Sequence, residues 1–470
     1  MSKTYYPIIG LEIHAELKTK SKMFCGCKND PDEERPNVNI CPVCMAHPGT
    51  LPVPNKEAIE SVIKVGLALD GNIANFTEFD RKNYFYPDIP KGYQISQYKY
   101  PIVSGGTLKG IQLTRIHLEE DTGTSKHDKG NYTHVDYNRA GVPLMELVTE
   151  PVIKTAQQAG DFARELQLLL RYLDVSNANM EKGEMRVEAN ISVSDDPEKW
   201  GTKVEVKNLN SFRSVEKAIE HELARMIALI EAGRRDEIKQ ETRGWDENKQ
   251  STFSQRSKEN AQDYRYFPDP DIPKLQLHDA FDLNMMQPAL PELPRQKRER
   301  YANDYKLKEG DIEVYVNDPE LSTYIETIAM NRAPEFIQSA SNYLVSDVLG
   351  NLKKDPTLSF PEREQFVELI QMVVGGEITS RGAKDILAII MKTPGSPKEI
   401  AQKEGLLQEN NEDALKPIIQ EVINSQEKIV ADYKSGKEAA LQALVGMVMK
   451  ATKGAANPAL AAKLLKELLA

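Results

Sequence analysis

The cysteines of the chain lie within twenty residues of one another, at Cys25, Cys27, Cys41 and Cys44. They form a C-x-C pair followed, after 13 residues, by a C-x-x-C pair. Four thiolates at such spacing can close a tetrahedral shell around zinc, which leaves no position open for catalysis. Free buried thiols and a redox pair are the alternative interpretations. We favour a structural zinc site, with His47 as a spare ligand nearby, because disulfides are rare in a reducing compartment.

Several carboxylates occupy positions where a charge is costly. Glu12 and His14 alternate with apolar residues and therefore share one face of a predicted strand. Glu120 continues the apolar parity of its own strand, and Glu146 is flanked by apolar residues. A carboxylate on an inward face requires a cation or a proton. For the segment that holds Glu12 and His14, a solvated strand face is the alternative.

A second polar face belongs to a predicted hairpin. Glu188 lies beside Arg186 in the alternating pattern, and the next strand offers Lys203 and Lys207. Such a face can simply be exposed to solvent. It can also line a cleft that holds a divalent ion and phosphates, because carboxylate oxygens are ligands for magnesium and basic side chains bind the phosphates of a nucleotide. The sequence contains neither G-x-x-x-x-G-K-[ST] nor G-x-S-x-G, so neither a P-loop nor a serine-hydrolase elbow is expected.

Aromatic and basic residues alternate in segments 79–88 and 263–271. Such segments can stack on nucleotide bases, and packing of a loop-rich core is the alternative. Residues 431–470 carry six lysines against three acidic residues, inside a chain of net charge −11. This local excess permits contact with a polyanion through lysines such as Lys450 and Lys453. A merely solubilised helical surface is the other interpretation.

These side chains need strands and helices to position them. Strict alternation predicts strands over 6–17, 109–121, 184–193 and 202–208, and apolar stripes of helical spacing predict helices around 162–173 and 215–230. After residue 294 the pattern favours helices alone, with a proline and glycine break at 392–397. We therefore predict an α+β fold with three domains, 1–294, an all-helical 295–395 and a small helical tail, 396–470.

Length and composition narrow the class of protein. The chain has 470 residues, of which 40% are hydrophobic and 28% charged, as in ordinary globular proteins. No apolar run approaches the roughly 20 residues that a membrane span needs. The first residues have no signal-peptide character, so we expect a cytoplasmic protein without a membrane segment. The net charge excludes a uniformly basic nucleic-acid coat.

Several longer motifs together resemble one family. They cover residues 10–14, 79–88, 94–97, 117–121, 207–212 and 263–271. In these motifs the sequence resembles the B subunits of the aspartyl/glutamyl-tRNA(Asn/Gln) amidotransferases. The resemblance runs over essentially the whole chain, and several of the motifs are eight or nine residues long.

The resemblance implies a division of labour in a heterotrimer. An amidase partner releases ammonia from glutamine, and a small third partner stabilises the pair. Proteins of the family that this chain resembles bind misacylated tRNA, use ATP to phosphorylate the side-chain carboxylate of the attached Glu or Asp, and let ammonia displace the phosphate. The resemblance also implies a cradle of antiparallel sheets and helices for the N-terminal domain. It implies magnesium ligands at Glu12, His14, Glu120, Glu146 and Glu188.

Two other functions stand against this interpretation. A non-catalytic tRNA-binding scaffold would need basic residues where Glu120 and Glu146 lie, so the inward carboxylates favour an enzyme. A free-standing zinc enzyme is disfavoured by complete cysteine ligation. In the enzyme, Arg186, Lys203 and Lys207 would neutralise phosphate charge. Whether the substrate is Glu-tRNA(Gln), Asp-tRNA(Asn) or both is left open by the sequence.

Overall fold

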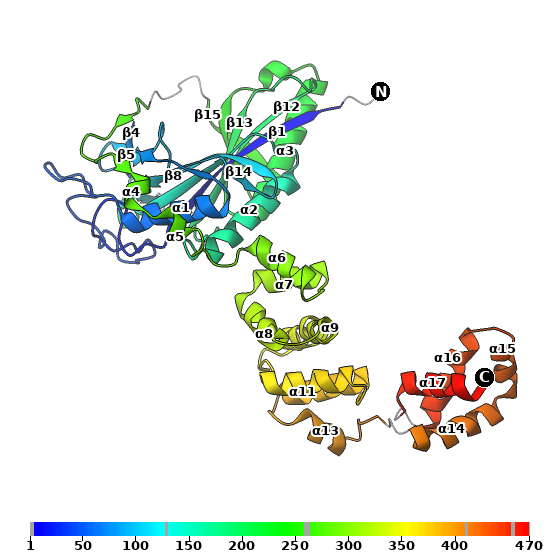
Figure 1. Ribbon diagram of the computed structural model, residues 1–470. Coiled ribbons are helices and arrows are strands. Elements are labelled where there is room, and N and C mark those ends of the chain that lie inside the picture. The colour runs from blue at the N-terminus through cyan, green and yellow to red at the C-terminus, as the bar shows by residue number, and fades with distance from the viewer. Residues whose placement is uncertain (1–3, 127–129, 258–263, 409–411, 453–455, 470) are drawn as a thin grey trace. The chain divides into compact units, whose positions relative to one another are not determined.

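The computed structural model describes residues 4–126, 130–257, 264–408, 412–452 and 456–469 (Figure 1). The chain divides into two compact units, Met1–Pro294 and Arg295–Ala470. The first unit is a mixed β-sheet with helices, and the second is built from helices. This arrangement confirms the α+β class that the sequence predicts.

A ten-stranded sheet organises the first unit, in the order β15-β14-β13-β12-β1-β11-β8-β6-β2, with β7 paired to β8. Its strands are β1 (Tyr6–Glu16), β2 (Asn72–Ile73), β6 (Val103–Ser104), β7 (Thr107–Leu108), β8 (Ile111–Glu120), β11 (Pro143–Thr149), β12 (Met185–Ser194), β13 (Val204–Leu209), β14 (Glu241–Asp246) and β15 (Ser251–Ser257). The β13–β14 pair is parallel, whereas the other pairs are antiparallel. The four predicted strands are confirmed, and the parallel pair makes the sheet mixed.

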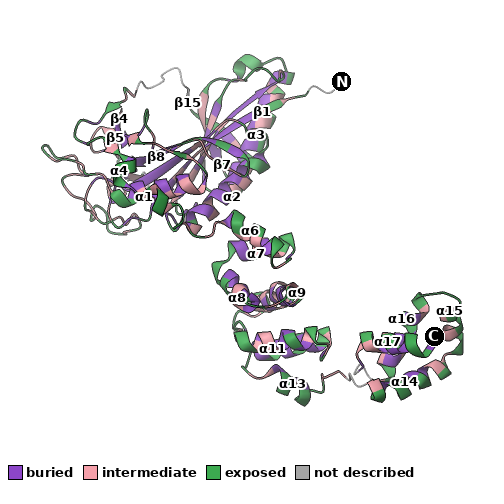
Figure 2. Ribbon diagram, viewed as in Figure 1, coloured by how far each residue is buried: buried purple, intermediate pink, exposed green. Residues whose placement is uncertain are grey.

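Helices cover one face of this sheet and form the core with it (Figure 2). They are α1 (Lys56–Ala68), α2 (Ala156–Tyr172) and α3 (Phe212–Glu231), and α3 packs on β12 while α1 packs on β8. The predicted stripes are buried, as Phe162 and Ile219 show. The N-cap side chains of Thr155 and Ser211 accept backbone N–H groups of α2 and α3, which explains where these helices begin.

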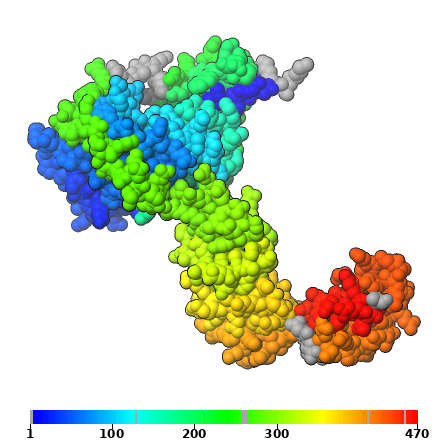
Figure 3. Space-filling view, viewed as in Figure 1, coloured from blue at the N-terminus to red at the C-terminus, as the bar shows by residue number. Residues whose placement is uncertain are grey.

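Smaller sheets bring together the two aromatic segments. Strands β4 (Asp80–Asn83), β5 (Tyr93–Ser96) and β16 (Phe267–Pro268) form one sheet, β3 (Phe76–Thr77) pairs with β17 (Leu275–Gln276), and β9 (Thr124–Lys126) pairs with β10 (His134–Asp136). Residues near 267 therefore lie against residues near 81 on the surface (Figure 3). Arg81 Nε lies 2.7 Å from Asp269 Oδ2 across this junction. Asp263, the first residue of the second motif, lies outside the described residues. The short helices η1 (Arg235–Glu237), α4 (Leu277–Ala280) and α5 (Leu283–Met286) complete the unit.

The second unit consists of helices joined by loops in its described part, with an isolated β-bridge between Ile378 and Leu407. It contains α6 (Pro294–Asn303), α7 (Glu309–Asn317), α8 (Pro319–Ala329), α9 (Pro334–Tyr343), the π-helical turn η3 (Leu344–Val348), α10 (Leu349–Lys354), α11 (Arg363–Val374), α12 (Ser380–Ile390), α13 (Pro397–Lys403), α14 (Glu412–Ser425), α15 (Glu427–Lys434), α16 (Ala439–Ala451) and α17 (Pro458–Leu469). Helix α13 packs on α11 and α12. Helices α14, α16 and α17 share a core of their own, which includes Leu415, Leu444 and Leu464. No helix in the described ranges is long and apolar enough to cross a membrane.

A buried ion network joins α3 to the edge of the large sheet. Glu222 is fully buried, and its Oε2 lies 2.7 Å from the Arg225 guanidinium. Its Oε1 lies 3.2 Å from Arg243 Nε on β14. Removal of one member from a buried network of a carboxylate and two guanidinium groups strongly destabilises the fold, because the remaining charges stay in a medium of low polarity.

We expect Glu222→Gln to lower the free energy of unfolding of the first unit by about 3 kcal/mol. Denaturant unfolding followed by tryptophan fluorescence measures the change. The matched control is Glu220→Gln, which removes an exposed carboxylate of the same helix that pairs with an exposed lysine. That control should change stability by less than about 0.5 kcal/mol. Equal effects of the two substitutions would contradict a structural role for the network.

Candidate active site and metal centre

The face of the large sheet opposite to the helices carries charged side chains. Cα partners across the strands are Glu12 with Glu188, His14 with Glu146, and Glu146 with His117. Facing pairs in a sheet lie close enough for their side chains to interact. Antiparallel pairing of β12, β1, β11 and β8 therefore brings together residues that are more than 170 positions apart in the sequence.

One cluster on this face consists of His14, Glu119 and Glu146, whose ligand atoms all lie within 4.8 Å of one another. His14 Nε2 lies 3.3 Å from Glu146 Oε2 and 3.5 Å from Glu119 Oε1. Burial would lower the pKa of His14, but the hydrogen bond that His14 donates to Glu146 and the charge of Glu119 raise it to about 9. Burial would raise the pKa of Glu146, yet His117 and His14 hold it well below its usual range. A nitrogen and carboxylate oxygens at these separations can share one divalent cation.

A second cluster consists of Glu12, Glu188 and Glu205, again within 4.8 Å. Burial and the charges of Glu146 and Glu188 raise the pKa of Glu12, so this carboxylate is destabilised as an anion. Lys207 Nζ lies 2.7 Å from Glu188 Oε2 and 3.5 Å from Glu205 Oε1. The arrangement can hold a cation at Glu12, while Lys207 neutralises the other two carboxylates.

Glu120 belongs to neither cluster. Its Oε2 accepts a hydrogen bond from Lys91 Nζ at 2.7 Å, and its Oε1 accepts one from the Ile95 N–H at 2.9 Å. The cation that the inward carboxylate requires is therefore a lysine. Glu119, one residue earlier, faces the charged side instead, and the sequence analysis missed it. Its shared parity with His117 is the signal that could have found it.

The predicted basic residues lie at different distances from the clusters. Arg186 is on the charged face, where it pairs with Asp121. Burial would raise the pKa of Asp121, but Arg186 and Arg139 lower it. Lys207 belongs to the second cluster, whereas Lys203 is exposed just before β13. The charged face thus combines carboxylates with at least two fixed cations.

The cysteines form a separate centre in the loop after β1. The sulfur atoms of Cys25, Cys27, Cys41 and Cys44 lie within 4.8 Å of one another. Cys41 Sγ and Cys44 Sγ are 3.8 Å apart, close to the roughly 3.8 Å expected for two sulfurs on one tetrahedral zinc. A hydrogen bond from Cys25 lowers the pKa of the Cys44 thiol to about 5 against the effect of burial. The four thiols fit a zinc ion.

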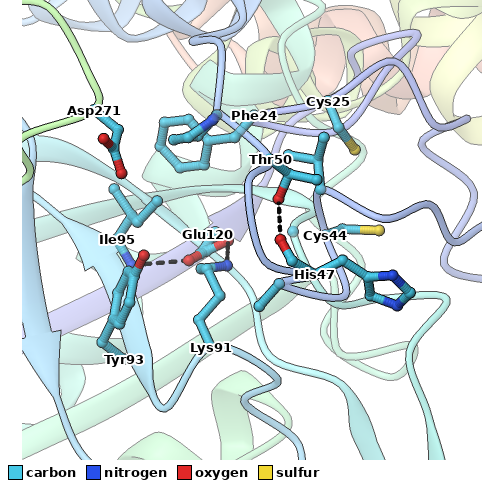
Figure 4. Close-up of a pocket in the computed structure, with 14 residues that line it drawn as sticks. Phe24, Cys25, Cys44, His47, Thr50, Lys91, Tyr93, Ile95, Glu120 and Asp271 are labelled. Carbon is cyan, nitrogen blue, oxygen red and sulfur yellow. Dashed lines mark hydrogen bonds and ion pairs between the residues drawn. The ribbon is translucent and has the colours of Figure 1, made fainter.

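A cavity of about 110 Å³ separates this centre from Glu120 (Figure 4). Cys25, Cys44 and His47 line one side, and Lys91 and Glu120 line the other. The cysteine loop therefore supplies part of the wall that encloses the Lys91–Glu120 pair. His47 itself lies outside the group of thiols.

The remaining predicted residues belong to the tail helices. Lys450 is exposed near the end of α16. It has no ion-pair partner among the described residues. Lys453 lies outside the described residues.

Comparison with known proteins identifies the class to which this fold and face belong. The model of the GatB/GatE catalytic domain matches residues 7–282, and that of the GatB domain matches residues 323–469. The chain is 44% identical over 477 residues to a protein of Persephonella marina, with 99% of both chains covered. It is 43% identical over 484 residues to a protein of Thermotoga neapolitana, with 99% of both covered, and 42% identical over 484 residues to one of Brevibacillus brevis, with 100% of this chain and 99% of that protein covered.

Each of these relatives is named as the B subunit of an aspartyl/glutamyl-tRNA(Asn/Gln) amidotransferase. The chain belongs to this family, which confirms the resemblance seen in its motifs. It is one component of a tRNA-dependent amidotransferase, and its enzyme class is that of ligases that form a carbon–nitrogen bond with glutamine as amide donor.

We expect one zinc ion per chain, bound by the four cysteines. Cys44→Ser should remove the metal and lower the melting temperature, because metal affinity contributes directly to folding of the loop. Elemental analysis of protein purified without chelator, together with a thermal scan, measures both. His47→Ala is the control and should keep the zinc. Wild-type protein that carries no zinc would contradict the assignment.

Proposed function

We propose that this chain phosphorylates the side-chain carboxylate of Glu on tRNA(Gln), of Asp on tRNA(Asn), or of both. ATP supplies the phosphoryl group, and ammonia then displaces the phosphate to give the amide. The observation that carries the proposal is the charged face, on which two clusters of hard ligand atoms adjoin Arg186 and Lys207. A scaffold that only binds tRNA has no need of such a face.

Magnesium is held, in this proposal, by His14, Glu119 and Glu146, with Glu12 and Glu188 as further ligands. Glu119 takes the role that the motif analysis assigned to Glu120, since Glu120 already has a lysine partner. Bound magnesium supplies charge neutralisation for the phosphoryl group. Glu188 is itself paired with Lys207, so its share in binding the metal depends on the release of that lysine.

The side chains of this protein contribute to the remaining requirements of the reaction. A carboxylate is a poor acyl donor to ammonia because oxide is a poor leaving group, and phosphorylation provides a better one. Arg186, Lys207 and the exposed Lys203 neutralise phosphate oxygens, which is most of what phosphoryl transfer demands of a protein. The acyl phosphate must meet ammonia before water, so the reacting carboxylate has to be enclosed when the substrate is bound.

The partners follow from the same proposal. An amidase partner supplies ammonia, and a small third partner completes a cytoplasmic heterotrimer. Misacylated tRNA is bound in part by the tail, within a predicted domain 396–470, through Lys450 and Lys453. The middle helices, predicted as a domain 295–395, connect the tail to the catalytic domain, 1–294. Zinc has a structural role only.

We expect Glu119→Gln to reduce phosphate release from ATP, in the presence of Glu-tRNA(Gln) or Asp-tRNA(Asn), by about 100-fold or more. Loss of an outer-shell group costs a metal site about 10–100-fold, and loss of a direct ligand costs at least as much. The purified complex should keep its basal glutaminase activity and its affinity for tRNA.

Glu120→Gln is the matched comparison, since it removes the neighbouring carboxylate and leaves the cluster intact. The magnesium concentration for half-maximal phosphate release should stay near the wild-type value in this variant. If Glu120→Gln raises that concentration and Glu119→Gln does not, the ligand assignment is reversed. If the wild-type complex releases no phosphate with either misacylated tRNA, the proposed function is wrong.

We expect Lys450→Gln to weaken tRNA binding and to reduce the slope of log affinity against log salt concentration by about one unit. Lys463→Gln is the control, because Lys463 already pairs with Glu412 at 2.9 Å and has less charge to offer. Filter binding at several salt concentrations measures both variants. An unchanged slope for Lys450→Gln would show that this lysine contacts no phosphate.

A further inference from the structure

Lys82 differs from the other cations around the charged face because it has no anionic partner among the described residues. Lys82 lies on β4, where its Cα pairs with Gln94 of β5. Its Nζ lies 5.2 Å from the ring centroid of Tyr264 and 5.9 Å from that of Tyr84. Within the described part of the chain it takes part in no ion pair and no side-chain hydrogen bond.

Three other basic side chains near the charged face each have a carboxylate partner. Lys91 Nζ lies 2.7 Å from Glu120, and Lys207 Nζ lies 2.7 Å from Glu188. Arg186 pairs with Asp121. A partly buried ammonium that lacks a carboxylate partner is costly unless something else supplies negative charge. Tyrosine ring faces supply a part of it, but they do not replace a hydrogen-bond acceptor.

Lys82 shares a strand face with a side chain that contacts the His14–Glu119–Glu146 cluster. The register pairs Lys82 with Gln94, and Ser96, two residues further along the same face of β5, donates a hydrogen bond to Glu119 Oε2 at 3.2 Å. Burial would lower the pKa of Lys82, but the charges of Glu119 and Glu146 raise it. Lys82 therefore stays protonated at neutral pH. The ring of Tyr266 lies 6.2 Å from that of Tyr264, so this tyrosine belongs to the same surroundings, and burial raises its pKa to about 12 against the effect of Lys82. A cation is thus held on the face of the small sheet that meets the cluster through Ser96.

We propose that the Lys82 ammonium binds an anionic oxygen of a reacting substrate beside the His14–Glu119–Glu146 cluster. The proposal rests on the proposed function. The oxygen comes either from a phosphate of the nucleotide or from the side-chain carboxylate of the aminoacyl group, and both offer the acceptor that Lys82 lacks. The tyrosines around Lys82 limit its freedom, so little order is lost when the anion binds. This assigns a task to the aromatic and basic segment 79–88, which the clusters alone leave unexplained.

The test uses the complete complex with Lys82→Met, and its first arm measures equilibrium binding. The dissociation constant of ATP with magnesium reports on the phosphate source. The ratio of dissociation constants for Glu-tRNA(Gln) and uncharged tRNA(Gln) reports on the carboxylate source. We expect one of these two quantities to change by about tenfold, because a hydrogen bond to a charged group is lost.

The second arm measures phosphate release from ATP with Glu-tRNA(Gln) present. A fall of about tenfold or more with both binding quantities unchanged also supports the proposal, since Lys82 then acts on the phosphoryl group during transfer. Lys82→Arg should recover a large part of any loss. Lys99→Met is the matched control, because Lys99 is exposed and lies over the ring of Tyr100 at 5.2 Å, so the same charge and the same kind of contact are removed. It should behave as the wild type.

Unchanged binding and unchanged phosphate release in Lys82→Met overturn the proposal. If Lys82→Met lowers the melting temperature, Lys82→Gln is measured in the same two arms, and unchanged values there overturn it equally. The failure of the proposed function is recognised separately. In that case the wild-type complex releases no phosphate, while the binding arm still reports whether Lys82 contacts ATP or the aminoacyl group.

Discussion

The register of β1 is the constraint on which the catalytic unit depends. This strand lies between β12 and β11, and its side chains alternate between the helix-covered core and the charged face. Leu11 and Ile13 are buried in the core, while Glu12 and His14 meet Glu188 and Glu146. A slip of one residue would exchange the two faces, and would move carboxylates into the core as well as break both clusters. The apolar packing that stabilises the sheet therefore also fixes the site.

The parts of the fold that were predictable are those in which the local pattern is strict. Strands such as β12 and helices such as α3 show period 2 or period 3.6 over ten or more residues, and burial on one side enforces that pattern. Two-residue strands such as β3 and β16 carry no pattern, since their pairing is decided by the fold. The parallel pairing of β13 with β14 could not be predicted from the sequence either, because it depends on the connection through α3 rather than on composition.

The candidate site was predictable in kind but not in every residue. Cysteine spacing alone identified the thiol cluster, because its members lie close in the sequence. Glu120 was selected because its parity is apolar, and that inference was sound: the carboxylate is buried and has a cation. The cation is Lys91, which is supplied by a segment with no pairing signal in the sequence. Partners brought by the fold, rather than positions on a strand, decide which of two adjacent carboxylates is neutralised by a lysine.

At the end of β8, two consecutive residues face two different environments. On one side Ser96 Oγ donates to Glu119 Oε2 at 3.2 Å, and on the other the Ile95 N–H donates to Glu120 Oε1. Two consecutive residues of β5 thus hold two consecutive residues of β8, one facing the charged face and one facing the cavity beside the cysteines (Figure 4). No intervening layer can absorb a displacement here. A small rotation of this strand end would move Glu119 and Glu120 together, so that the cavity and the charged face would change shape at the same time.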